Sequence, residues 1–142
     1  MEKPRNGVGL RWNTGGWFGG QIGGTLWMLI SALVVWSTDA SVALLLLACF
    51  AIPNVLATGI WMRRDRWRPV AALLTLFALI GAFSLAATVV LDRAGSFATL
   101  GYGGTTTSGT MYFMIALLTP GLMLMIYFQD RSLRKRGSDQ PD

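Results

Sequence analysis

The chain has 142 residues, 53% of them hydrophobic and 13% charged, and a net charge of +5. It contains no histidine and one cysteine, Cys49, which excludes a His/Cys metal site, a CxxC redox pair and a Cys–His nucleophile within one chain. The basic residues border apolar runs instead of forming a stripe, and the acidic residues lie outside those runs. We therefore expect no nucleic-acid partner, no cofactor and no enzymatic activity.

Four apolar runs of 18 to 22 residues dominate the chain. A helix rises about 1.5 Å per residue, so each run is long enough to cross a hydrocarbon core of roughly 30 Å. The sequence therefore predicts an all-α membrane protein, an antiparallel four-transmembrane-helix bundle in a single integral membrane domain over residues 1–142. The predicted spans are 17–36, 41–62, 70–91 and 111–128, with cytoplasmic tails 1–14 and 129–142.

The first run carries three glycine pairs at a spacing of four residues, a glycine-zipper pattern. At 100° per residue the pairs cover about half of the helix circumference, so another helix can approach the bare backbone closely. We predict packing on this face, most simply by a helix of the same chain. A second copy of the chain is one alternative, and a flexible entry over 15–20 is another. The glycines are Gly15, Gly16, Gly19, Gly20, Gly23 and Gly24.

Polar side chains are rare inside the first two runs. Pro53 removes one helix hydrogen bond and predicts a kink in the second run, and the amide of Asn54 beside it is expected to bond to a neighbouring helix. The alternative interpretation is a polar path through a small transporter or channel. Its candidate residues are Gln21, Thr25, Asn54 and Thr58.

The second connection is rich in arginine. Of the 12 basic residues, 11 lie before the first run, in this connection or after the fourth run, and the other two connections hold only Arg93. Because Lys and Arg resist translocation, we predict a multi-pass protein of the cell (inner) membrane with both termini cytoplasmic. Near a negative leaflet each guanidinium is worth about 1 kcal/mol, so we also expect contact with anionic lipid headgroups. The candidates are Arg63, Arg64, Arg66 and Arg68.

Aromatic residues agree with this orientation, because Trp and Tyr prefer the headgroup level. Trp27 alone among the tryptophans lies in the middle of a predicted span, where we expect it to pack against a helix or lipid tails. At the inner level we place Trp12, Trp17, Trp61, Trp67 and Tyr127, and at the outer level Trp36, Tyr102 and Tyr112.

The third connection contains Thr99-Leu100-Gly101-Tyr102-Gly103. This stretch resembles the TxGYG selectivity filter of potassium channels, in which backbone carbonyls replace the hydration shell of the ion. The resemblance covers five residues, and it implies a tetrameric pore with the loop on the external side. The chain departs from that family in two respects: only 92–98 separates the third run from the motif, which is short for a pore helix, and Gly104 stands where the family usually has an acidic residue.

The third connection, 92–110, is long enough to bring the fourth helix beside the first, so we expect the bundle to close on the glycine face. The leading functional prediction is a non-enzymatic accessory or scaffold subunit, or a small homo-oligomer, that acts through helix packing. The alternative is the small transporter or channel. The expected partners are the lipid bilayer, anionic lipids, and a second copy or another membrane protein.

Overall fold

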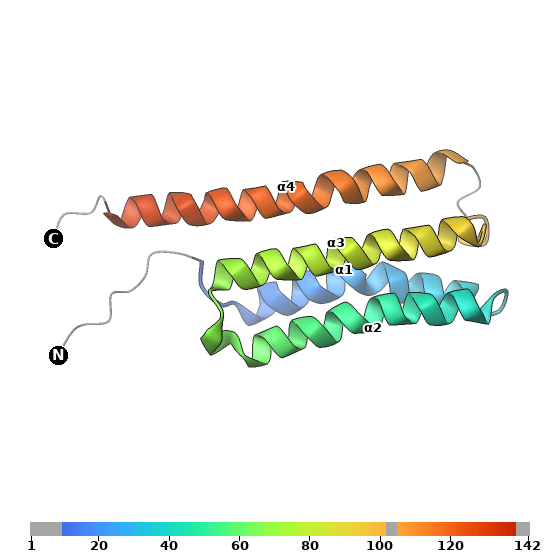
Figure 1. The fold of residues 1–142 in the computed structure, drawn as a ribbon, viewed down its shortest axis with the longest axis horizontal. Helices are drawn as coiled ribbons and strands as arrows, with labels where there is room; N and C mark the ends of the chain where they lie inside the picture. Colours follow the sequence, from blue (N-terminus) through green and yellow to red (C-terminus); the bar gives the residue numbers. More distant parts are fainter. Residues whose placement is uncertain (1–9, 102–104, 139–142) are drawn as a thin grey trace.

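The computed structural model describes residues 10–101 and 105–138, and within them the chain forms four long helices and no strand (Figure 1). Each of the four is long and apolar enough to cross a membrane. The prediction of an all-helical, multi-pass membrane protein is therefore confirmed. The elements are α1 (Thr14–Val35), α2 (Ala40–Met62), the short 3-10 helix η1 (Arg64–Arg66), α3 (Pro69–Arg93) and α4 (Thr105–Ser138).

Polar side chains and one glycine set the helix ends. The Asn13 side chain accepts a hydrogen bond from the Gly16 N–H at the start of α1, and Asp39 accepts two from the first turn of α2. These caps satisfy donors that a helix start leaves without partners. At the end of α3, Gly95 has φ +64°, and the next N–H, that of Ser96, bonds back to the Leu91 carbonyl. Gly95 fits because glycine adopts this left-handed backbone without strain.

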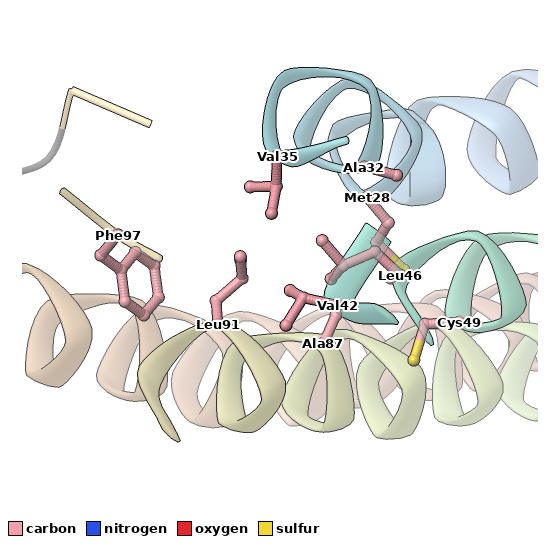
Figure 2. Packing of buried hydrophobic residues seen from close by; sticks show 9 residues of the cluster. All are labelled: Met28, Ala32, Val35, Val42, Leu46, Cys49, Ala87, Leu91 and Phe97. Carbon is pink, nitrogen blue, oxygen red and sulfur yellow. The ribbon is translucent and has the colours of Figure 1, made fainter. Parts of the chain in front are cut away.

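Helices α1, α2 and α3 pack together and enclose the core. One buried cluster lies near the turn between α1 and α2, where side chains from all three helices converge (Figure 2). Phe97, just beyond α3, covers that end of the core. A second cluster, towards the other end, is built around Trp17, Leu76 and Ile80. The three helices are therefore packed along most of their length.

The fourth helix packs against α3 and lies on the far side of α3 from α2 (Figure 1). The expected packing of α4 against the glycine face of α1 is therefore wrong. The two helices lie close together at Gly81, where an added Cβ would lie 2.5 Å from Cγ2 of Thr119. A small residue on α3 admits the β-branched Thr119, and in lipid such close contacts decide which helices pair.

The helices extend beyond the charge-free runs from which the spans were predicted. The difference is largest for α4, which begins at Thr105 and continues to Ser138, past both ends of 111–128. The polar stretch after Phe128 stays helical, and Asp130 and Arg134 form an ion pair across one turn, with Arg134 Nε 2.7 Å from Asp130 Oδ2. The charged residues after Phe128 therefore do not end the helix.

Candidate functional site

The four polar residues singled out in the sequence meet between α1 and α2. Gln21 and Thr25 lie one turn apart on the buried face of α1, and Asn54 and Thr58 lie one turn apart on α2. Gln21 is 3% exposed and Thr25 is fully buried. Spacing of four residues places two side chains on the same helix face, so each helix presents a pair to the other. We call Gln21, Thr25, Asn54 and Thr58 the polar cluster.

Hydrogen bonds close the polar cluster. The Gln21 amide nitrogen donates to the backbone carbonyl of Asn54 at 2.9 Å and to Thr58 Oγ1 at 3.2 Å. The Asn54 amide nitrogen donates to Thr25 Oγ1 at 2.8 Å and to the Phe50 carbonyl at 2.7 Å. Both threonine hydroxyls donate to carbonyls four residues earlier in their own helices. Every side-chain donor of the polar cluster therefore has an acceptor within the two helices.

Among the fully buried side-chain atoms of the polar cluster, Oε1 of Gln21 lacks a partner, since it accepts no hydrogen bond. A lone carbonyl acceptor and four neutral side chains supply no proton donor or base that titrates near neutral pH. On the side of α2, Asn54 and Thr58 also border an open groove of about 440 Å³, whose other walls are Val55, Gly59 and Met62. Chemically, the polar cluster is suited to joining two helices.

The glycine face of α1 is mostly open. An added Cβ at Gly19, Gly20 or Gly23 would meet nothing within 4 Å, and at Gly15 and Gly16 it would meet only Asn13, the cap of the same helix. At Gly24 it would lie 3.0 Å from Cγ2 of Ile80 on α3. Among the described residues, α3 therefore approaches this face at its last glycine alone, and a partner for the other positions stays a prediction.

Aromatic side chains gather where α1 begins and α2 ends. The Trp61 ring lies 5.4 Å from the ring of Trp12, 5.9 Å from that of Trp17 and 5.5 Å from that of Phe18, measured between centroids. The Arg64 guanidinium lies over Trp61 at 5.4 Å. These rings were assigned to one membrane level from the sequence, with the exception of Phe18, and they occupy one end of the bundle. The tilted and edge-to-face ring contacts and the cation–π contact hold α1 and α2 together there.

The other residues singled out in the sequence lie outside the polar cluster and do not gather in one place. Arg63, Arg64 and Arg66 are exposed around η1, whereas Arg68 borders a cleft formed with α4. Trp27 is partly buried and packs against the first core cluster, as expected for a mid-span tryptophan. In the third connection, 94–101 forms turns directly after α3, and Gly101 has φ +78°. Tyr102 and Gly103 of the filter-like motif lie outside the described residues.

Two features were missed by the sequence analysis. The contact of Gly81 with Thr119 joins α3 to α4, and its only signal is a small residue within an apolar run. Asp130 is 8% exposed, and its Oδ1 accepts a hydrogen bond of 3.4 Å from the Leu10 N–H. Because Asp130 lies in a charged segment beyond the fourth run, nothing in the pattern distinguished it from a solvated tail residue.

No family model matches the chain, and comparisons with curated proteins and with solved structures found no match.

Proposed function

We propose that this multi-pass membrane protein is a non-enzymatic accessory or scaffold subunit, or a small homo-oligomer, whose work is done by helix packing. The observation that carries the proposal is the closed hydrogen bonding of the polar cluster. Its donors are directed at α1 and α2 themselves, with distances of 2.7 to 3.2 Å, and this is the arrangement of side chains that hold helices together.

The open glycine face of α1 is the proposed contact with another membrane helix, from a second copy or from a different protein. Gly19 and Gly23 lie one turn apart with no atom near an added Cβ, so a partner backbone has room to approach them. Close approach gains dispersion and Cα–H to carbonyl contacts, which drive association in lipid, where apolar side chains have no hydrophobic reason to pair.

Subunit counting in lipid nanodiscs tests the glycine contact. We expect the wild type to be oligomeric and Gly19→Leu plus Gly23→Leu to be monomeric but folded. The matched control is Gly59→Leu plus Gly121→Leu. These glycines lie on α2 and α4, and an added Cβ at either would also meet nothing within 4 Å. Dissociation by both double variants contradicts a contact specific to α1. A monomeric wild type rules out the homo-oligomer and leaves a different membrane protein as the partner to be captured.

The proposed orientation places both termini and η1 in the cytoplasm, with an antiparallel bundle in the cell (inner) membrane. It rests on the arginines around η1 and after α4. Single cysteines at Ser37 and at Arg66, in a Cys49→Ser background, test it with a membrane-impermeant maleimide added to intact cells. We expect labelling at position 37 and none at position 66 until the membrane is opened. The reverse pattern contradicts the orientation.

A small transporter or channel is the second candidate, and one observation favours it. The buried Oε1 of Gln21 has no donor, so the polar cluster has one acceptor left over for a passing solute. Uptake of small polar solutes into proteoliposomes that contain the wild type, and loss of this uptake in Gln21→Leu, would establish this alternative.

A further inference from the structure

A cleft of about 410 Å³ lies between the beginning of α3 and the charged part of α4. Three arginines border it: Arg68, just before α3, and Arg131 and Arg134 on α4. They come from segments more than 60 residues apart in the sequence, so only the packing of α4 on α3 brings them together. None of the described contacts of the polar cluster involves this cleft.

The charges in the cleft do not cancel. Arg134 is paired with Asp130, whose other oxygen accepts the Leu10 N–H, so this carboxylate is already used. Arg68 and Arg131 have no carboxylate within ion-pair distance among the described residues. Three guanidiniums and one carboxylate leave a net charge of +2. Guanidinium groups bind phosphate oxygens in paired, directional hydrogen bonds, so an anion with phosphate groups is the ligand that fits.

The other walls of the cleft are apolar. Val70, Ala71 and Leu74, from the first turns of α3, and the Tyr127 ring line it below the arginines. Pro69 occupies the first turn of α3, and no described side chain caps that helix, so its first N–H groups and its dipole also favour an anion there. A charged rim above an apolar wall, where a membrane-spanning helix begins, matches a phosphate group attached to acyl chains.

We propose that this cleft binds the headgroup of an anionic phospholipid, with its phosphates at Arg68 and Arg131 and its acyl chains leaving past Leu74 into the bilayer. The net charge of +2 favours a lipid with two phosphodiesters, of the cardiolipin class. The site differs from the general attraction of arginine-rich loops to anionic leaflets, because Arg63, Arg64 and Arg66 do not border the cleft. It rests on the membrane placement of the chain and not on the proposed scaffold role.

Native mass spectrometry of the full chain, released from neutral detergent and titrated with cardiolipin or phosphatidylcholine, tests the proposal. We expect cardiolipin to bind at least tenfold more tightly than phosphatidylcholine. Arg68→Gln plus Arg131→Gln should weaken cardiolipin binding by about 30-fold, because two guanidinium contacts are lost. The matched control, Arg63→Gln plus Arg66→Gln, removes the same charge from the same end of the bundle, and we expect less than a threefold effect.

Equal weakening by the two double variants overturns the proposal, since it would show attraction to the whole basic surface. Equal binding of cardiolipin and phosphatidylcholine overturns it as well. Glycerol phosphate serves as the soluble probe: if it competes at the concentration at which cardiolipin binds, the ligand is a free phosphate compound and not a lipid. All substituted arginines are exposed, and circular dichroism checks that the helices are intact. The native mass spectra also report the oligomeric state, so failure of this site is distinguished from failure of the scaffold proposal.

Discussion

The bundle of α1, α2 and α3 and the fourth helix are both apolar, yet they are packed very differently. In each of the first three spans a third of the most apolar window is buried inside the protein, whereas in α4 only 6% is buried. Mean hydropathy does not explain the difference, because the α4 window, at 1.9, is more apolar than that of α1, at 1.5. In lipid, apolarity places a helix in the membrane but does not decide its neighbours.

Specific contacts make the difference. Helices α1 and α2 share the polar cluster and the rings around Trp61, and all three of the first helices contribute to the two buried clusters of side chains. The fourth helix packs mainly against α3, with a close approach of Thr119 to Gly81, and Asp130 accepts a hydrogen bond from the Leu10 N–H. Most of its surface, including Phe113, Leu117, Leu124 and Phe128, is left to lipid or to another protein.

A cavity in the core should have the largest effect. Leu46 is fully buried between α1, α2 and α3, and we expect Leu46→Ala to lower the free energy of unfolding by about 2–3 kcal/mol through lost packing. The matched change on α4, Leu124→Ala, should cost less than about 0.5 kcal/mol because this side chain is 56% exposed. Steric-trap unfolding in bicelles measures both. Equal losses would mean that α4 is as much part of the core as α2.

The attachment of α4 should be broken at Gly81. A Cβ there would lie 2.5 Å from Cγ2 and 3.1 Å from Cβ of Thr119, so rotation of Thr119 cannot clear the clash and α4 must move. We expect Gly81→Ala to cost about 1–2 kcal/mol and to widen the distance distribution between spin labels at positions 89 and 113. Labels at positions 33 and 44, on α1 and α2, should be unaffected.

The control for this clash is Thr119→Ala, which removes the two nearest atoms. It should restore most of the narrow distance distribution in the Gly81→Ala background, because the remaining contact of 3.1 Å needs a shift of only a few tenths of an ångström. Gly59→Ala, on the open side of α2, should change neither label pair. A narrow distribution in Gly81→Ala alone would show that the α3–α4 contact does not depend on this glycine.

The same contrast explains how much the sequence could predict. Long apolar runs with charges at their borders predicted four helices, because lipid permits little else for such runs. The sequence also predicted that the Asn54 amide bonds to a neighbouring helix, and it donates to Thr25 on α1, which lies beside α2 (Figure 1). The partner of α4 was missed because the small residue at its contact with α3, Gly81, stands alone in an apolar run, whereas the far more conspicuous glycines of α1 drew the prediction.

Loss of a single hydrogen bond between α1 and α2 should lower the free energy of unfolding by less than Leu46→Ala or Gly81→Ala. Thr25 and Thr75 each donate to the carbonyl four residues earlier at 2.9 Å, but only Thr25 also accepts a bond from the other helix, at 2.8 Å from Asn54 Nδ2. We expect Thr25→Val to cost about 0.6 kcal/mol, the average for such bonds in membranes, and Thr75→Val to cost almost nothing. Unfolding free energies of the two isosteric variants measure the bond. Equal values would show that the polar cluster adds no stability to the α1–α2 contact.

The smallest expected effect belongs to the charged end of α4. The Asp130–Arg134 pair spans one turn, and the Arg134 side chain is half exposed, so screening by water limits its contribution to about 0.3–0.5 kcal/mol. We expect Arg134→Gln to raise the amide exchange rates of residues 127–135 about twofold and to leave those around Leu46 unchanged. Arg63→Gln, which also removes one positive charge but lies outside α4, is the control. If exchange around Leu46 also accelerated, the end of α4 would be coupled to the core, contrary to what the low burial of α4 implies.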